Sequence, residues 1–403
     1  MRELRELLAK LLRSDKLRTV VAFATSAAAF AVANLLFADH LQPETYGKLA
    51  LVVAILAVGS PLAPLGLAFM VVRERLPAEP RLLVRCGATS VLVAIGSAAV
   101  GTLVYGLGKI ELAIVLVGVL GGGFVRLASG MLQSEERFVA STLASESINY
   151  LLLAAALGAV AVGATSGIWP LTVVALAQLL LAAAIWAALL AANRAEPRPA
   201  AQLPFTEMLL LSATNAAMLV LFQVERFAIP MFLGLEQLAA FAVLSVFTIA
   251  PFRPIEFSTY RTLLPKLRRP GTGLERRQLF LREVGQTTAL LAAIGLGVAA
   301  VTPFVLTFLF GDKYHFTFGT VLAGVAGGQL RVARSLVSAA IAALADHKGL
   351  AIWNGLAWVS VGASFLGGWL GSHWGLEGFL WGVALGGLAN IVLTLPILRP
   401  HLR

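Results

Sequence analysis

Long apolar runs separated by short polar breaks dominate the chain. A bilayer core about 30 Å thick needs roughly 20 helical residues at about 1.5 Å rise each. The runs reach that length, are rich in Ala and Leu, and lack the alternation typical of membrane barrels. They predict about twelve transmembrane helices, near residues 19–37, 48–70, 83–107, 110–132, 142–163, 168–192, 208–232, 237–263, 284–310, 318–345, 351–371 and 375–398.

Composition narrows the class to an all-α integral membrane protein. Of the 403 residues, 59% are hydrophobic and 13% are charged, whereas soluble domains carry about 25% charged residues. The single cysteine, Cys86, excludes a disulfide framework and a multi-thiolate metal site, and the five histidines lack ligand spacing. The sequence has no Gly-Lys-Ser/Thr nucleotide signature and no large polar region for a catalytic site. We therefore expect no enzyme, no metal and no bound cofactor.

The distribution of Lys and Arg predicts the orientation. With the N-terminus inside, about 24 of them lie in cytoplasmic segments, about 3 outside (Lys48, Lys109 and Lys313) and about 4 within helices. This bias places both termini in the cytoplasm and indicates a multi-pass protein of the inner (plasma) membrane. The Lys and Arg residues that give the net charge of +10 then face anionic membrane lipids, so the charge does not indicate a nucleic-acid partner.

A proline-rich stretch divides the chain near its middle. Pro197, Pro199 and Pro204 stop helices and predict a cytoplasmic linker. A short internal repeat after the first helix of each half supports two parallel repeats, since Glu44 and Tyr46 match Glu236 and Leu238. The predicted organisation is an amphipathic interfacial helix (1–18), an N-lobe of helices 1–6 (19–192), the linker (193–206) and a C-lobe of helices 7–12 (207–403).

Charges embedded in the second half are the main candidate site residues, since one charge at mid-helix costs about 2.5–3.5 kcal/mol. They are Glu225, Arg226, Arg253, Glu256, Arg331 and Arg334. Arg331 and Arg334 lie on one helix face with no acid nearby in that helix. They need a wet cavity, an acid from another helix or an anionic ligand, and Arg binds phosphate with a planar fork. The structural alternative pairs them with Glu225 and Glu256, and Arg253 with Glu256.

One carboxylate of the first half is a candidate for ion coupling. Glu146 shares a helix face with Asn149, and a carboxylate in a low-dielectric cavity can bind H⁺ or Na⁺. A structural ion pair between Glu146 and Arg126 is the alternative. Glu225 and Glu256 are the other coupling candidates.

Three segments carry a resemblance to a known family. They are Leu41-Gln42-Pro43-Glu44-Thr45-Tyr46-Gly47-Lys48-Leu49-Ala50 with Pro64-Leu65-Gly66-Leu67, then Val224-Glu225-Arg226-Phe227, and then Leu263-Leu264-Pro265-Lys266-Leu267. They resemble the polysaccharide-transporter family, the Wzx-type flippases of lipid-linked oligosaccharides. That family belongs to the MOP superfamily with the MATE exporters and the lipid II flippase. The chain departs from the family pattern at Asp39 and Gln42, and it has Glu225 where Asp is usual.

The resemblance implies a function for the embedded charges. Two six-helix lobes would enclose a partly cationic cavity that opens alternately to each side. A polyprenyl-pyrophosphate-linked oligosaccharide would pass from the cytoplasmic to the outer leaflet for cell-surface polysaccharide (O-antigen, lipopolysaccharide) synthesis, with the polysaccharide polymerase machinery as a partner. We hypothesise that Arg226, Arg253, Arg331 and Arg334 neutralise the pyrophosphate. The alternatives are a MATE-like, cation-coupled exporter of small amphipathic molecules and a non-transporting lipid-binding scaffold.

Overall fold

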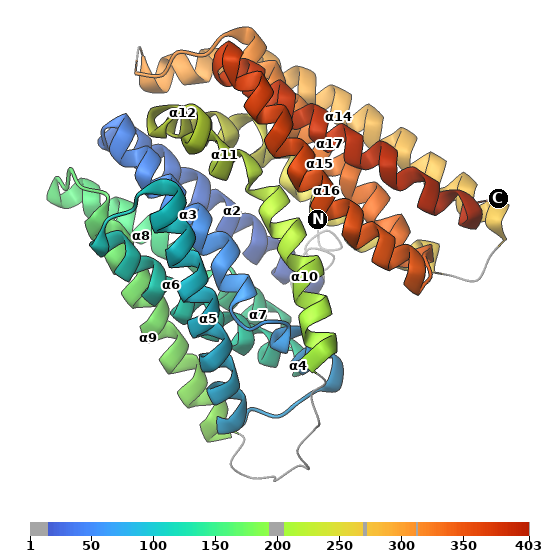
Figure 1. Cartoon of the computed structure of the whole chain (residues 1–403), viewed down its shortest axis with the longest axis horizontal. Coiled ribbons are helices and arrows are strands. Elements are labelled where there is room, and N and C mark those ends of the chain that lie inside the picture. The colour runs from blue at the N-terminus through green and yellow to red at the C-terminus, as the bar shows by residue number, and fades with distance from the viewer. Residues whose placement is uncertain (1–14, 193–204, 269–271, 312, 403) are drawn as a thin grey trace, which may run out of the picture. The chain divides into compact units, whose positions relative to one another are not determined.

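The computed structural model describes the chain except for residues 1–14, 193–204, 269–271, 312 and 403 (Figure 1). Those described residues fold into α-helices and short 3-10 turns, without a strand. Most of the predicted interfacial helix (1–18) and of the predicted linker (193–206) falls outside them. The all-helical class expected from the apolar runs is confirmed.

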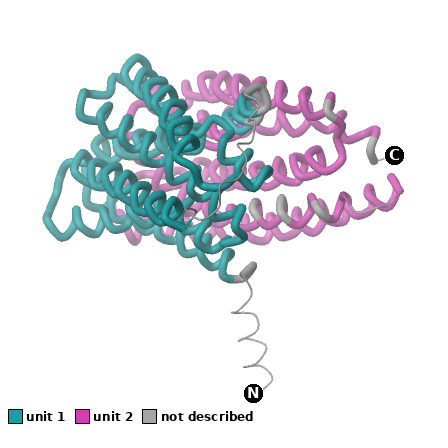
Figure 2. Tube along the Cα trace, turned by 90° about the horizontal axis from the view of Figure 1, so that it is seen from below, with its two compact units in different colours: residues 1–216 teal, residues 217–403 magenta. Residues whose placement is uncertain are grey.

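The chain divides into two compact units, Met1–Ala216 and Ala217–Arg403, which Figure 2 colours teal and magenta. The boundary lies inside helix α10 (Phe205–Phe222), later in the chain than the predicted linker. The first turns of α10 belong to the first unit because they pack there, with the Met208 backbone against Gly66.

The first unit is centred on one long helix. Its helices are α2 (Asp15–His40), α3 (Pro43–Leu62), α4 (Leu67–Glu74), α5 (Pro80–Tyr105), α6 (Lys109–Ser134), α7 (Phe138–Ser145), α8 (Ser147–Val162) and α9 (Ile168–Ala192). Helix α6 packs against α3, α5 and α9. Its glycines permit this approach, since a Cβ at Gly121 would lie 2.9 Å from the backbone nitrogen of Leu179. Proline in the first turn starts α3 and α5, where the missing N–H costs nothing.

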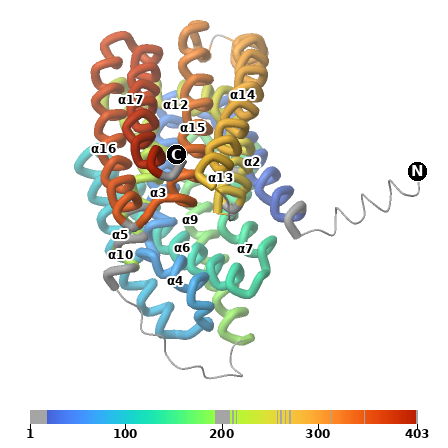
Figure 3. Tube along the Cα trace, turned by 90° about the vertical axis from the view of Figure 1, so that its right-hand side faces the viewer, coloured from blue at the N-terminus to red at the C-terminus, as the bar shows by residue number. Residues whose placement is uncertain are grey.

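The second unit is built around α15. After the end of α10 come α11 (Val224–Phe232), α12 (Leu235–Thr248), α13 (Arg253–Leu267), α14 (Gly273–Phe310), α15 (Phe318–Leu344), α16 (His347–Gly371) and α17 (Gly375–Leu398). Helix α15 packs against α13, α14 and α17, and α16 runs beside α17 (Figure 3). Side-chain caps start three of these helices: Thr272 with Glu275 for α14, Thr317 for α15 and Asp346 for α16.

Each of the twelve predicted ranges coincides with one helix or with two consecutive helices. In the described part of the chain, eight helical stretches are long and apolar enough to cross a membrane, or nine if the bent pair α7–α8 is one crossing. Helices α16 and α17 form a single stretch in that count, and α15, which carries Arg331 and Arg334, is not among them. The number of crossings and the cytoplasmic termini stay predictions.

Large apolar side chains cover the outer faces of the helices. Phe308 on α14 is 87% exposed and Leu103 on α5 is 85% exposed, while many serines are buried, as are Asn34 and Asn390. Soluble proteins rarely expose a wide apolar surface. This surface suits lipid surroundings and indicates a multi-pass membrane protein.

Candidate functional site

An ion pair between α11 and α15 forms the centre of the candidate site. The helical path is interrupted at Gln223, so that Glu225 lies in the first turn of α11. Arg331 Nη2 donates to Glu225 Oε2 at 2.8 Å and to Oε1 at 2.9 Å. The two side chains are 12% and 8% exposed. Arg331 is therefore paired with Glu225 of another helix, as the structural alternative to ligand binding predicts.

Arg334 lies one turn further along α15 and is bound differently. It is 7% exposed, and its Cζ lies 4.8 Å from the centroid of the Phe222 ring, which supports a cation–π contact. Its Nη2 atom is buried and has no hydrogen-bond partner among the described residues. Glu256 lies within electrostatic range of Arg334 without forming an ion pair in the described structure. Arg334 is therefore a buried, partly unsatisfied cation.

A small cavity adjoins these side chains. It measures about 40 Å³, and its lining includes Glu225, Arg331, Arg334 and Ser364. Sites for drug-sized ligands measure about 300–1,000 Å³, and one water needs about 10–15 Å³. In this conformation the cavity has room for a small ion or a few waters and none for a pyrophosphate-linked sugar.

The other predicted residues of the second half are not part of the described lining of this cavity. Arg226 follows Glu225 on α11 and is 6% exposed. Arg253 and Glu256 begin α13, directly after the 3-10 turn Ala250–Phe252. Ser335 Oγ donates to the Glu256 carbonyl at 2.9 Å, which fixes α13 against α15.

A second polar cluster surrounds Glu146 in the first unit. Glu146 occupies the break between α7 and α8, which are bent by 50°. Asn149 Nδ2 donates to Glu146 Oε2 at 3.1 Å and to Ser26 Oγ at 2.8 Å, and Ser26 Oγ lies 3.4 Å from the same carboxylate oxygen. The hydroxyl of Ser147 is buried without a hydrogen-bond partner in the described structure.

The alternative ion pair between Arg126 and Glu146 is not formed among the described residues. Neutral groups surround the carboxylate instead, and a proton or a hard cation that prefers oxygen ligands can bind there. The described residues contain no cluster of three or more His, Cys, Asp or Glu side chains suited to a metal.

Sequence reasoning missed the groups that other helices bring to each cluster. Ser26 lies on α2, and Phe222 and Ser364 lie on α10 and α16, far along the chain from their partners. Helical spacing reveals only neighbours on the same helix. Nothing in the sequence indicated these residues.

Comparison with known proteins supports the fold. No family model and no curated protein matches the chain. Among solved structures, the lipid II flippase MurJ in an inward closed conformation matches with a TM-score of 0.68 and 13% identity, covering 94% of this chain and 87% of that one. The MATE multidrug transporter DinF-BH in complex with rhodamine 6G matches at 0.63 and 13%, covering 97% and 95%. An inward-facing MATE family transporter of the MOP superfamily matches at 0.61 and 14%, covering 95% and 98%. The chain therefore has the fold that MurJ and the MATE transporters share.

Proposed function

We propose that the chain is an inner-membrane transporter that moves a polyprenyl-pyrophosphate-linked oligosaccharide between leaflets by alternating access. The observation that carries this proposal is the pair of arginines one turn apart on α15. Arg331 is bound to Glu225, and Arg334 has an unsatisfied Nη2. The chain has the fold of MurJ and the MATE transporters. A buried arginine costs several kcal/mol unless a partner or a ligand compensates it. Two buried arginines on one helix therefore favour an anionic substrate.

The arginines act on the pyrophosphate in two stages. In the first stage Arg226 and Arg253 meet the phosphate, and Arg331 remains bound to Glu225. Protonation of Glu225 removes the negative charge, releases Arg331 and lets the cavity open around Arg331 and Arg334. A bidentate contact between guanidinium and phosphate then replaces the contact with the carboxylate.

Ion coupling uses the Glu146 cluster together with Glu225 or Glu256. Glu146 lies at a helix break, so binding of H⁺ or Na⁺ there acts directly on the angle between α7 and α8. Ser26 on α2 takes part in the same hydrogen bonds. Binding of H⁺ or Na⁺ to the Glu146 cluster therefore changes how α2 and α8 pack. This change couples ion binding to the movement of helices.

A second candidate is cation-coupled export of small amphipathic molecules. It is supported by the likeness to the MATE transporter that was solved with rhodamine 6G, which covers 97% of this chain. The embedded arginines make a cationic passenger less suitable. The two candidates predict opposite effects of losing Arg334: loss of lipid flipping, or unchanged or improved export of cations.

The experiment uses the purified full chain in vesicles with a fluorescent polyprenyl-pyrophosphate-linked sugar. Arg334→Gln is expected to lower the flipping rate at least tenfold. Glu146→Gln is expected to keep basal flipping and to abolish its dependence on a proton or sodium gradient. Arg276→Gln, an arginine of α14 outside both clusters, is the matched control. Flipping by Arg334→Gln at the wild-type rate would overturn the proposal, and efflux of rhodamine 6G by the same vesicles would favour the second candidate.

A further inference from the structure

We infer that the cavity beside Arg334 is a binding site for chloride, a small monoatomic anion, within the second unit. This inference concerns a resident ion and does not depend on what the chain transports. It rests on the unsatisfied guanidinium of Arg334, on the charge of the lining and on the size of the cavity.

One buried hydrogen-bond donor of the cavity lining has no acceptor among the described residues. It is the guanidinium Nη2 of Arg334 on α15. The lining also contains Ser364 on α16, a residue that is 1% exposed. A buried donor without an acceptor costs free energy comparable to a lost hydrogen bond. The unsatisfied guanidinium therefore indicates an acceptor bound in the cavity.

The lining has an excess of positive charge. Its charged side chains are Glu225, Arg331 and Arg334. The bond between Arg331 and Glu225 neutralises both, so the charge of Arg334 is left over. Glu256 offsets part of this charge from outside the lining, without an ion pair in the described structure. One monovalent anion in the cavity balances the lining, which a neutral water does not.

The size of the cavity selects the class of anion. A volume of about 40 Å³ equals roughly three times the 10–15 Å³ that holds one water. Glycines create this space: a Cβ at Gly327 on α15 would meet no atom within 4 Å. The Phe222 ring covers one face of the Arg334 guanidinium, with its centroid 4.8 Å from Cζ. In this conformation the site therefore suits a halide and is too small for a phosphate ester.

The test measures the thermal unfolding midpoint of the purified full chain in sodium chloride and in sodium gluconate at equal ionic strength. A ligand that binds only the folded state raises the midpoint with its concentration. For the wild type we expect a saturable rise of about 2–4 °C in chloride and none in gluconate or phosphate. Equilibrium binding of radioactive chloride is expected to give one ion per chain.

Three variants isolate the site. Arg334→Gln removes the positive charge and Ser364→Ala removes a hydroxyl from the lining, whereas Gly327→Leu fills the cavity and keeps both side chains. Each is expected to lose the rise in chloride, and Gly327→Leu keeps the inference testable if Arg334→Gln does not fold. Gly362→Leu on α16, where a Cβ also meets no atom but lies outside the lining, is the matched control. A wild-type midpoint equal in chloride and gluconate, or an undiminished rise in Gly327→Leu, would overturn the inference.

Discussion

Arg331 Nη2 donates to both carboxylate oxygens of Glu225, at 2.8 and 2.9 Å, and so joins α15 to α11. One turn later on the same helix, Arg334 has a ring contact with Phe222 and an unsatisfied Nη2. The two arginines share a helix face and differ in how they are compensated. Arg331 is bound to a carboxylate, whereas Arg334 keeps a donor that a ligand can use.

Loss of one partner of the buried pair is expected to destabilise the fold strongly. Glu225→Leu leaves Arg331 as an uncompensated buried charge and should lower the free energy of unfolding by about 3–5 kcal/mol. The double variant Glu225→Leu with Arg331→Met replaces the pair by apolar groups and should recover most of that loss. The measurement is unfolding by titration with SDS in mixed micelles, followed by circular dichroism.

The matched control for this pair is Glu236→Leu, which removes an exposed acid from the first turn of α12. Its stability should stay near that of the wild type. If the single variant Glu225→Leu is as stable as the control, the ion pair does not hold α11 to α15.

A glycine seam holds α16 against α17. It consists of Gly367 and Gly371 on α16 and Gly378, Gly382 and Gly386 on α17, spaced four residues apart on each helix. A Cβ at Gly371 would collide with the backbone carbonyl of Gly378, and one at Gly382 with that of Gly367. Small residues at such spacing let helix backbones approach closely in membranes.

Filling this seam should separate the two helices. Gly382→Ile is expected to lower the free energy of unfolding by about 1–3 kcal/mol through overpacking, measured by the same SDS titration. Gly362→Ile places the same side chain on α16, where a Cβ meets no atom within 4 Å. Equal stability of the two variants would contradict close packing at the seam.

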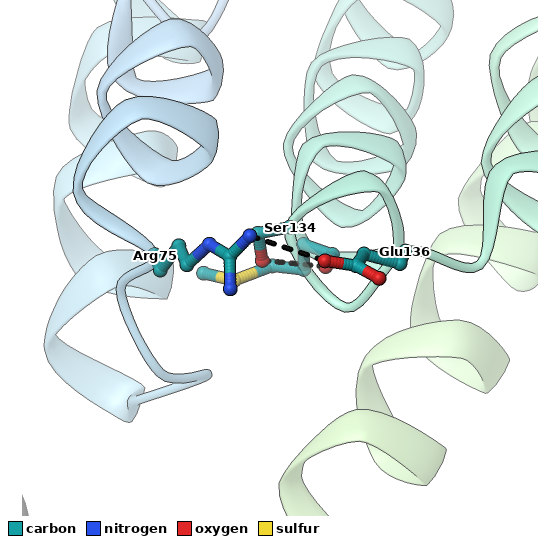
Figure 4. Close-up of polar contacts among 4 residues, drawn as sticks. Arg75, Ser134 and Glu136 are labelled. Carbon is teal, nitrogen blue, oxygen red and sulfur yellow. Dashed lines mark hydrogen bonds and ion pairs between the residues drawn. The ribbon is translucent and has the colours of Figure 1, made fainter.

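Backbone strain accompanies an ion pair at the ends of α4 and α6 (Figure 4). Arg75 and Glu136 have φ of +49° and +62°, in the left-handed region that favours glycine. Arg75 Nη2 lies 3.1 Å from Glu136 Oε1, and the side chains are 73% and 66% exposed. An exposed pair contributes about 0.2–1 kcal/mol, while a left-handed L-residue costs roughly 1–2 kcal/mol.

At Glu136, relief of the backbone strain should therefore stabilise the fold by more than loss of the ion pair destabilises it. Glu136→Gly and Glu136→Ala both remove the pair, and only glycine removes the strain. We expect Glu136→Gly to be more stable than Glu136→Ala by about 1 kcal/mol and at least as stable as the wild type. A glycine variant less stable than the alanine variant would show that the left-handed conformation is not adopted in the native state.

The sequence predicted the helices well because hydrophobic length determines where helices form in lipid. Each apolar range coincides with helical structure, even where it divides into pairs such as α7 and α8. The breaks at Glu146 and Gln223 were not predicted, because neither position has a proline or glycine that would mark an interruption. The prolines Pro61 and Pro64, and Pro251 and Pro254, do mark the breaks between α3 and α4 and between α12 and α13. Helical spacing predicted that Arg331 and Arg334 share one helix face. Their partners could not be predicted in this way, because they depend on which helices pack together.

The single cysteine allows the predicted orientation to be tested. Cys86 on α5 is buried, 0% exposed, with its Sγ 3.6 Å from Ser90 Oγ, so an impermeant maleimide should not label the wild type. On a Cys86→Ala background, Lys109→Cys at the start of α6 and Arg277→Cys on α14 place thiols at exposed positions. The positive-inside distribution predicts labelling of Lys109→Cys in intact cells and of Arg277→Cys only after permeabilisation. The reverse result would put both termini outside, and the basic residues of α14 would then face away from the anionic inner leaflet.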